Sequence, residues 1–307
     1  MTVHFFSYIV KLPNDLSLCK LPVNEATLDY DAQYPRNHYD RLADDEWTRL
    51  TQSRRGELNY LVHMDVLHQH ITADMSVLEI GAGAGIYTKE LVHMTRKLVV
   101  ADLSKVQLDL NREHMRDLGV VDLVDEYRVL DLVDLSEIND SCFDAIVCIG
   151  GPLSYLLNKA KVGVQELIRV VKPGGVVILG VMSLISTLIR FMGSLVSEKD
   201  EIGIENLRSV LETGIQDREH NPGREHYCHM MTCTDLDLLL KNEDIEIVER
   251  RAPGLLSLAP EEALAQVRED DELWEVLVDR ELAWSRLPGA SDLGTNIIYV
   301  ARKSETN

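Results

Sequence analysis

The chain has 307 residues, of which 45% are hydrophobic, so it can bury a full core within one large domain. Its 51 acidic residues outnumber the 31 basic ones, and the formal net charge of -20 is spread along the sequence. Because nucleic-acid binding depends largely on cations that neutralise phosphates, this charge argues against DNA or RNA as a substrate. The five cysteines form no CxxC pair, which favours free thiols in a reducing cytoplasm.

The first 70 residues are predicted to form an N-terminal arm and a helical cap. Residues 1–35 contain three prolines and no clear hydrophobic period, which is typical of an extended arm. Residues 39–70 carry apolar side chains at spacings near three and four, which predicts helix. Apolar residues exposed on this arm would be consistent with a homodimer.

The sequence predicts neither a signal peptide nor a membrane span. Residues 1–10 are apolar but lack a basic n-region and a small-residue cleavage site. Residues 183–196 are too few to cross a bilayer, and Arg190 interrupts them. We therefore expect a cytoplasmic protein without a membrane partner.

Residues 71–307 are predicted to form the main domain, in which β-branched runs alternate with helical segments. Strands are expected at residues 76–80, 97–101, 126–129, 143–149 and 176–181, and helices at residues 87–95, 105–118 and 161–170. This alternation is typical of a parallel sheet that helices cover on both faces. The predicted fold class is therefore α/β.

The alternation stops at residues 182–232, which are predicted to form a lid or substrate-binding insertion after the fifth strand. It resumes with a helix at residues 234–242, opened by Thr234 as N-cap, and a strand at residues 245–250. An acidic helix at about residues 260–286 and a strand at residues 295–301 follow. The acidic helix is amphipathic, which favours a solvated face over a site for a basic partner.

Three alternate glycines in the run VLEIGAGAG, residues 77–85, stand between a predicted buried strand and a helix. Glycines at such a turn let the backbone bend sharply and approach a ligand closely. A dinucleotide fingerprint would need its third glycine where Ile86 stands, and a P-loop would need Lys and Ser or Thr after the glycines. The sequence meets neither of these phosphate-binding patterns. The glycines therefore either bind a different ligand or form a tight turn that binds no ligand.

The series Glu79, Gly81, Gly83 and Gly85 resembles the first motif of the class I S-adenosylmethionine methyltransferases. Four further marks stand in the order that this family has. They are Asp102 after the second strand, Asp131 and Leu132 after the third, the run from Phe143 and Asp144 to Gly150, Gly151 and Pro152 around the fourth, and VVKPGG at residues 170–175 before the fifth.

The resemblance implies a Rossmann-like sheet of seven strands, mostly parallel with the last strand antiparallel, and S-adenosyl-L-methionine as the cofactor. It implies that Asp102 binds the ribose hydroxyls, for which a helix N-cap is the alternative role, and that Asp131 and Leu132 hold the adenine. The residues expected to bind the cofactor are Tyr39, Arg54, Glu79, Gly81, Ala82, Gly83, Asp102, Leu103, Asp131, Leu132, Ile149 and Gly150.

Methyl transfer from a sulfonium is an in-line displacement, which needs alignment of the reactants more than a fixed catalytic residue. A general base helps with hydroxyl, acidic carbon or protonated amine acceptors, and His is its usual source near neutral pH. The expected catalytic residues are His226, His229 and Tyr39, since similar enzymes close a tyrosine over the cofactor, and Arg54 is expected to pair with the cofactor's carboxylate. Other candidates for the acceptor site are Tyr34, His38, Trp47, Tyr155, His220 and Tyr227.

A cluster of soft ligands, His226, Cys228, His229 and Cys233, raises zinc as a hypothesis. Its spacing matches no standard structural zinc pattern, and the segment also suits a strand with alternate buried residues. No metal is therefore expected.

The predicted function is methyl transfer to oxygen, nitrogen or carbon of a small-molecule acceptor, a specialised metabolite. Two alternatives stay open. One is methylation of a protein side chain, for which the acidic surface would attract a basic substrate. The other is a methyltransferase-like cyclase or binding protein that transfers no methyl group, because a fold does not fix a function.

Overall fold

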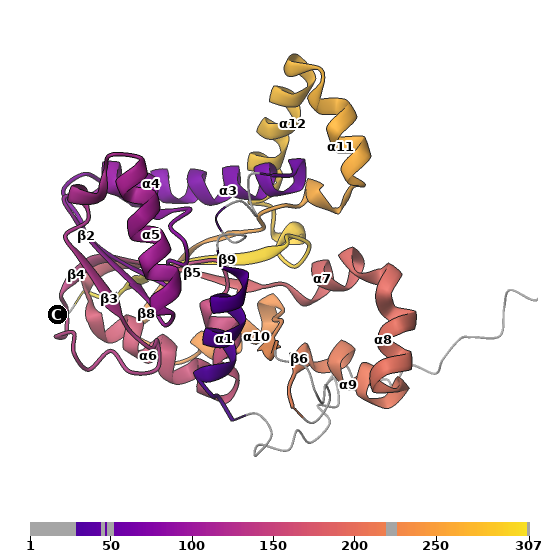
Figure 1. Ribbon diagram of the computed structural model, residues 1–307, viewed down its shortest axis with the longest axis horizontal. Coiled ribbons are helices and arrows are strands. Elements are labelled where there is room, and N and C mark those ends of the chain that lie inside the picture. The colour runs from indigo at the N-terminus through magenta and orange to yellow at the C-terminus, as the bar shows by residue number, and fades with distance from the viewer. Residues whose placement is uncertain (1–28, 44–46, 48–51, 219–225, 306–307) are drawn as a thin grey trace, which may run out of the picture.

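The computed structural model describes residues 29–43, 47, 52–218 and 226–305 and is built around one large sheet (Figure 1). Its seven strands have the order β3-β2-β1-β4-β5-β9-β8. They are β1 (Ser76–Ile80), β2 (Lys97–Asp102), β3 (Glu126–Val129), β4 (Phe143–Cys148), β5 (Val171–Met182), β8 (Ile245–Arg251) and β9 (Asn296–Lys303). Neighbours from β3 to β5 pair in parallel, whereas β9 runs antiparallel to both β5 and β8. The predicted α/β class, with seven strands and the last one antiparallel, is confirmed.

Helices cover both faces of the sheet, as Figure 1 shows. On one face lie α3 (Arg54–His70), α4 (Thr88–Met94) and α5 (Lys105–Asp117), and on the other lie α6 (Ala160–Val170) and α10 (Cys233–Leu240). Val77 packs into the core under the first group, and its neighbour Leu78 packs into the core under the second. All five residues of β1 are therefore buried. This burial on both faces explains why Val77, Leu78 and Ile80 are apolar, with Glu79 as the one charged residue of the strand.

Two predicted helices differ from those in the structure. The single helix expected at residues 260–286 is a pair, α11 (Glu261–Arg268) and α12 (Asp271–Trp284), because Asp270 caps the second helix by accepting from the N–H of Leu273. The helix expected from Thr234 begins one residue earlier. Thr232 is its N-cap, since it forms a capping box with Asp235 three positions later.

The N-terminal arm is only partly within the described residues, since residues 1–28 lie outside them. The first described helix, α1 (Gln33–Leu42), already begins inside the stretch expected to be extended. Within the described residues, the helical pattern expected over residues 39–70 includes the end of α1, Trp47 and α3. The domain boundary at residue 70 stays a prediction.

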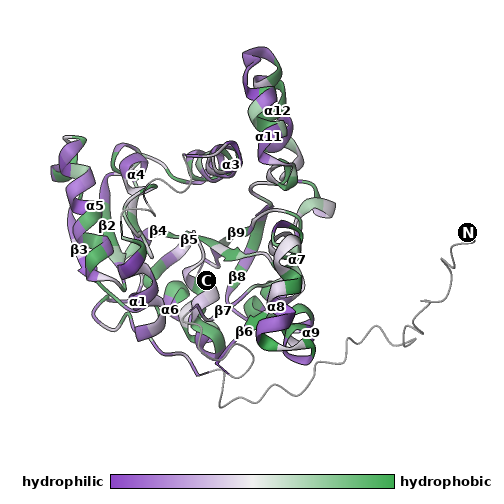
Figure 2. Ribbon diagram, turned by 45° about the vertical axis from the view of Figure 1, so that its right-hand side comes forward, coloured by the Kyte–Doolittle hydropathy of each residue, from purple (hydrophilic) through white to green (hydrophobic). Residues whose placement is uncertain are grey.

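The predicted insertion at residues 182–232 contains several short elements. They are α7 (Leu184–Arg190), α8 (Leu195–Ile202), α9 (Ile204–Thr213) and a two-stranded ribbon of β6 (Ile215–Gln216) and β7 (Cys228–His229). Outside it, α11 and α12 project from the body as a helical hairpin with mixed polar and apolar residues (Figure 2). Among the helices that the structure describes, none is long and apolar enough to cross a membrane.

Short 3-10 turns complete the structure at η2 (Val121–Leu123), η3 (Pro152–Lys159), η4 (Met192–Ser194), η5 (Leu256–Leu258) and η6 (Pro288–Ala290). Of these, η3 matters for the site because it follows the carboxyl end of β4 directly. Its first residues face the loop after β1, so the segments that follow two neighbouring parallel strands meet there.

Candidate functional site

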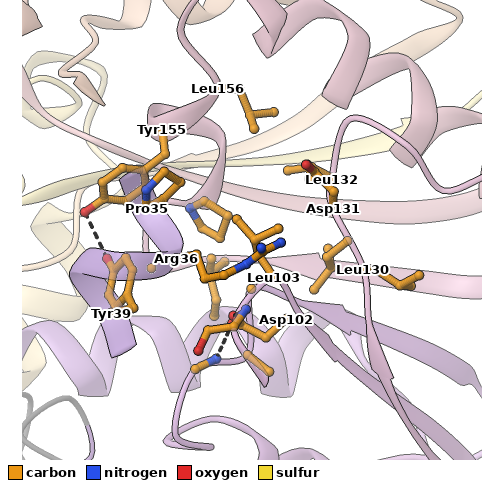
Figure 3. Close-up of a pocket in the computed structure, with 18 of the residues that line it drawn as sticks. Pro35, Arg36, Tyr39, Asp102, Leu103, Leu130, Asp131, Leu132, Tyr155 and Leu156 are labelled. Carbon is orange, nitrogen blue, oxygen red and sulfur yellow. Dashed lines mark hydrogen bonds between the residues drawn. The ribbon is translucent and has the colours of Figure 1, made fainter. Parts of the chain in front are cut away.

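A pocket opens at the carboxyl ends of the parallel strands, where an open α/β sheet usually binds its ligand (Figure 3). Its walls come from the residues that follow β1, β2, β3 and β4, and from the N-terminal segment that includes α1. The free space between these walls is about 920 Å³, including the part open to solvent. Segments far apart in the sequence therefore converge on one site.

The glycine loop after β1 forms one wall, and its first glycine is required on two grounds. Gly81 has a φ of +74°, a conformation that side chains disfavour. A Cβ atom added there would lie 2.1 Å from Cγ of Pro152, the first residue of η3. The loop can therefore approach η3 closely only because this position carries no side chain.

Glu79, expected from the motif to contact the cofactor, lies behind the pocket wall and not in it. Its carboxyl accepts a hydrogen bond from the Thr88 hydroxyl at 2.7 Å, and Thr88 in turn accepts one from the Asn111 amide at 2.8 Å. Burial raises the pKa of Glu79 to about 8. This carboxyl therefore supports the glycine loop from beneath and ties it to α4 and α5.

Asp102 lines the pocket at the end of β2. One carboxylate oxygen accepts the backbone N–H of Gly83 at 2.8 Å, and the other accepts that of Ser104 at 2.8 Å. The helix-cap role that was the alternative for Asp102 belongs to Ser104, whose hydroxyl accepts the N–H of Gln107 at the start of α5. The Asp102 carboxylate is thus held in a fixed orientation at the pocket wall.

Asp131 lies at the end of the pocket that is farther from Tyr39 and Tyr155 in Figure 3. Its carboxylate accepts a hydrogen bond from the hydroxyl of Tyr30 at 2.9 Å. The apolar side chains Leu103, Leu130 and Leu132 line the same part of the pocket. This end therefore combines one carboxylate with apolar walls, a surface suited to a flat heterocycle with an amino group.

Tyr39 from α1 and Tyr155 from η3 point toward one another at the opposite end, and 2.9 Å separates their hydroxyl oxygens (Figure 3). The Tyr155 hydroxyl also lies 2.9 Å from Nε2 of His226. Burial, and to a lesser extent the charge of the nearby His38, lower the pKa of His226 to about 4. His226 is therefore neutral at neutral pH.

The central part of the chain matches a known family. Residues 77–175 match the family model described as "Methyltransferase domain". Over these residues the chain contains a methyltransferase domain. The match covers β1 to β4 and the first residues of β5, and so it includes the segments after β1 to β4 that line the pocket but not the wall from α1.

Curated relatives match about a third of the chain. The chain is 29% identical over 101 residues to the mitochondrial ubiquinone biosynthesis O-methyltransferase of Rattus norvegicus, which is 33% of this chain and 29% of that protein. It is 35% identical over 103 residues to the ubiquinone/menaquinone biosynthesis C-methyltransferase UbiE of Escherichia coli (strain K12 / DH10B), which is 33% of this chain and 39% of that protein. The chain thus spans less than two thirds of the length of these relatives.

Solved structures extend the likeness to most of the fold. The [4+2]-cyclase SpnF has a TM-score of 0.54 at 16% identity, with 91% of this chain and 98% of that chain covered. The N-methyltransferase NodS from Bradyrhizobium japonicum WM9, in complex with S-adenosyl-L-homocysteine, has a TM-score of 0.51 at 16% identity, with 90% and 100% covered. At such identities the likeness shows the fold alone.

Most residues expected to bind the cofactor of this methyltransferase domain come together in the pocket, but Arg54 does not. The pocket is lined by Tyr39, Gly81, Ala82, Gly83, Asp102, Leu103, Asp131, Leu132, Ile149 and Gly150. Arg54 begins α3, where its guanidinium pairs with Glu57 at 2.5 Å and its N–H donates to Glu261. Its predicted contact with the cofactor's carboxylate is therefore not supported by its position.

Arg36 lines the pocket, although the sequence analysis singled out no role for it. It lies on α1 three positions before Tyr39, so the two side chains share a face of the helix. The spacing of three residues between Arg36 and Tyr39 is the sequence feature from which the position of Arg36 could have been predicted. Tyr30 also lines the pocket, and only the fold brings it there, whereas Pro152 belongs to the motif quoted after the fourth strand.

The candidates for the acceptor site separate in the structure. His226, Tyr155 and Tyr39 are joined by hydrogen bonds, and the ring of His38 lies 4.7 Å from that of His226. His229 pairs with Ile215 in the ribbon and does not line the pocket.

The remaining acceptor-site candidates occupy other surroundings. Tyr34 and Tyr227 contact edge to face at 4.8 Å in a smaller hollow that also includes Tyr155, and Trp47 stacks on His114. His220 lies outside the described residues.

The residues of the zinc hypothesis do not form a cluster. Within the described ranges, no group of three or more His, Cys, Asp or Glu side chains could hold a metal ion. Cys233 packs near Tyr299 at the start of α10, while Cys228 lies 3.9 Å from Nδ1 of His226.

Proposed function

We propose that the protein is an S-adenosylmethionine-dependent methyltransferase that methylates oxygen, nitrogen or carbon of a small-molecule acceptor, a specialised metabolite. The observation that carries this proposal is the pocket itself. It combines the glycine loop after β1, the Asp102 carboxylate after β2 and the Asp131 carboxylate after β3 in one continuous surface.

The residues present fit the cofactor from end to end. Leu103, Leu130 and Leu132 would enclose the adenine, with the Asp131 carboxylate available to its amino group. Asp102 would accept hydrogen bonds from the ribose hydroxyls.

Gly150 supports the same orientation at the other end. A Cβ atom added to it would meet nothing within 4 Å, so its backbone faces open space in which the methionine part would lie. The reactive sulfonium would then lie toward Tyr39 and Tyr155.

The bound cofactor would supply an electrophilic methyl group. The chain's task is to align acceptor and methyl group and to exclude water. The pairing of Tyr39 with Tyr155 encloses the acceptor side between α1 and η3, which supports a small acceptor over a protein tail.

The proposal is tested by binding of S-adenosylmethionine to the purified protein, measured by calorimetry for the wild type and Asp102→Ala. Loss of hydrogen bonds to a charged group should weaken binding about 10- to 100-fold. Asp109→Ala is the matched control, because Asp109 is an exposed aspartate of α5 whose carboxylate pairs with Lys105 on the same helix. Absence of binding by the folded wild type, or equal affinity of Asp102→Ala and wild type, would contradict the proposal.

The acceptor claim has its own readout. Release of S-adenosylhomocysteine that depends on an added small molecule would support methyl transfer. Binding of S-adenosylmethionine without release of S-adenosylhomocysteine, whichever acceptor is added, would support the cyclase or binding-protein alternative. We also propose the cytoplasm as the compartment, since the four described cysteines, Cys142, Cys148, Cys228 and Cys233, are free thiols.

A further inference from the structure

Tyr30 holds the Asp131 carboxylate at the end of the pocket that the adenine would fill. Its hydroxyl donates to Oδ1 of Asp131 at 2.9 Å, and the backbone N–H of Val133 donates to the same oxygen at 3.1 Å. Among the residues that the structure describes, both of the bonds that this carboxylate accepts engage Oδ1. Oδ2 therefore remains for a ligand in the pocket that Tyr30 and Asp131 line.

Tyr30 is itself held by η3 and by the apolar core. Its backbone N–H donates to Oδ1 of Asn158 in η3 at 3.1 Å, and the Asn158 amide donates in turn to the Asp29 carboxylate at 2.9 Å. The ring of Tyr30 packs against the buried cluster that contains Leu130 and Leu132. These contacts fix both the backbone and the ring of Tyr30, so its hydroxyl meets Asp131 from a defined position.

The direction of the bond between Tyr30 and Asp131 follows from the two groups. An ionised carboxylate has no proton to donate, whereas a phenol has one. Burial, and then the charge of Asp131, raise the pKa of Tyr30 above its usual value, although the charge of Arg36 acts in the opposite sense. The phenol therefore keeps its proton at neutral pH and donates it to the carboxylate.

A carboxylate oxygen held in this way matches one edge of a purine base. Adenine carries an amino group at C6, which donates, beside N1, which only accepts. Hypoxanthine carries an oxo group at C6, which only accepts, beside an N–H at N1. The fixed oxygen would meet a donor at C6 of adenine and an acceptor at C6 of hypoxanthine, and two facing acceptors lose their hydrogen bonds to water without replacement.

We propose that Tyr30 is a specificity-determining residue, which fixes Asp131 so that the site selects a 6-aminopurine over a 6-oxopurine. Without the phenol, the carboxylate can turn toward the N–H at N1 of a 6-oxopurine, and the site discriminates less. Tyr30 acts through Asp131 and is therefore a positioning residue. This inference rests on the proposed function and adds the group by which the site recognises its cofactor.

The first test needs no cofactor and measures the coupling of the two side chains. Urea denaturation gives the unfolding equilibrium constants of the wild type, Tyr30→Phe, Asp131→Ala and the double variant. Because each single substitution removes the same hydrogen bond, the unfolding constant of the double variant should be about tenfold lower than the product of the two single effects predicts. Effects that simply multiply would mean that the two side chains are not coupled, and would overturn the proposal.

The second test compares S-adenosylhomocysteine with S-inosylhomocysteine, which differ only at C6 and N1 of the base. Each is titrated into the purified protein and its affinity is measured by calorimetry. We expect the wild type to bind S-adenosylhomocysteine at least about tenfold more tightly, and Tyr30→Phe to reduce this ratio to about threefold or less. No preference in the wild type, or the same ratio in Tyr30→Phe, would overturn the proposal.

Two further variants separate positioning from packing. In the Asp131→Ala background, Tyr30→Phe should leave the ratio of the two affinities unchanged, because the carboxylate that Tyr30 positions is gone. A further change of the ratio there would overturn the proposal, since Tyr30 would then act on the base without Asp131.

Tyr299→Phe is the matched control. The Tyr299 hydroxyl donates to the backbone oxygen of Cys233 at 3.3 Å, and Tyr299 does not line the pocket. Its substitution should leave both affinities as in the wild type, and a loss of preference equal to that of Tyr30→Phe would contradict a specific role for Tyr30. Failure of the folded wild type to bind either compound would overturn the proposed function as well, whereas equal binding of both compounds would overturn this inference alone.

Discussion

Gly81 combines a strained conformation with a close contact, so a single methyl group at this residue should be costly. Its φ is +74°, and an added Cβ would lie 2.1 Å from Cγ of Pro152. We expect Gly81→Ala to lower the free energy of unfolding by about 2–4 kcal/mol and to abolish cofactor binding. Urea denaturation and calorimetry measure the two effects.

Gly193→Ala is the control for this prediction. Gly193 lies in η4, and an added Cβ would meet nothing within 4 Å. Its substitution should change the free energy of unfolding by less than about 1 kcal/mol. Similar losses of unfolding free energy in Gly81→Ala and Gly193→Ala would show that neither the contact with Pro152 nor backbone strain causes the destabilisation.

His226 should make stability depend on pH. Its folded-state pKa is about 4, against 6.5 for the free side chain, so between these values the unfolded chain binds a proton that the folded chain does not. The free energy of unfolding should therefore fall as the pH drops from 6.5 to 4, by at most about 1.4 kcal/mol per pH unit and about 3 kcal/mol in total. Below pH 4 the loss should stop.

His226→Gln isolates this contribution from those of other titrating groups. The free energy of unfolding of this variant should lack the pH dependence that His226 contributes. The difference in free energy of unfolding between wild type and variant should therefore shrink as the pH falls from 6.5 to 4. Parallel curves across that window would mean that His226 has an ordinary pKa in the folded protein.

The presence of Asp102, Asp131 and Gly81 in one pocket could be predicted from the sequence, because each stands at the end of a strand of the predicted parallel sheet. The carboxyl ends of parallel strands share one edge of the sheet. Arg54 and Arg36 could not be distinguished in this way. Both precede the first strand, and only the packing of α1 and α3 decides that Arg36 lines the pocket while Arg54 pairs with Glu57.

At the scale of the elements, the strands were predictable and the helix ends less so. The strand pattern is strong because β1, β2 and β4 are covered on both faces and leave few polar positions. The division between α11 and α12 depends on the side chain of Asp270, whose capping bond competes with helix continuation. An amphipathic spacing that continues through both helices hides this break.

The attachment of α1 to the rest of the domain depends on one buried amide. Gln107 of α5 is fully buried, and its Nε2 donates to the backbone oxygens of Tyr39 at 2.8 Å and Ala43 at 3.0 Å. These oxygens lie at the C-terminal end of α1, where the Tyr39 oxygen also accepts the N–H of the C-cap residue Ala43 at 3.1 Å. We expect Gln107→Met to loosen α1, raising hydrogen exchange across Gln33–Leu42, and to weaken cofactor binding about tenfold.

Gln165→Met is the matched control, because Gln165 is exposed and its amide donates to Glu243 at 3.3 Å, away from α1. It should leave exchange in α1 and cofactor affinity unchanged. If Gln107→Met also leaves exchange in α1 unchanged, the helix is held by other contacts, such as that between Ser104 and Asp40.

At the scale of the whole molecule, a buried network of charges joins the sheet, α3 and the projecting hairpin. Arg251 of β8 has a fully buried side chain that pairs with Asp65 of α3 at 2.6 Å and with Glu249 at 3.0 Å. Its Nε donates to the Ser285 hydroxyl at the end of α12 at 2.9 Å, and Arg286 pairs with both carboxylates from outside. A single guanidinium thus connects three parts of the fold that are far apart in the sequence.

Removal of that guanidinium should be more costly than removal of its neighbour on the same strand. Arg251→Met leaves Asp65 and Glu249 without their buried cation, so we expect the free energy of unfolding to fall by about 3–5 kcal/mol. Arg250→Met removes an arginine that faces the other side, where it pairs with Asp237 in a half-exposed ion pair, and should cost about 1 kcal/mol or less. The two free energies of unfolding are measured by urea denaturation. Comparable losses for Arg251→Met and Arg250→Met would mean that Arg286 alone holds the hairpin and that burial of Arg251 adds nothing to the stability.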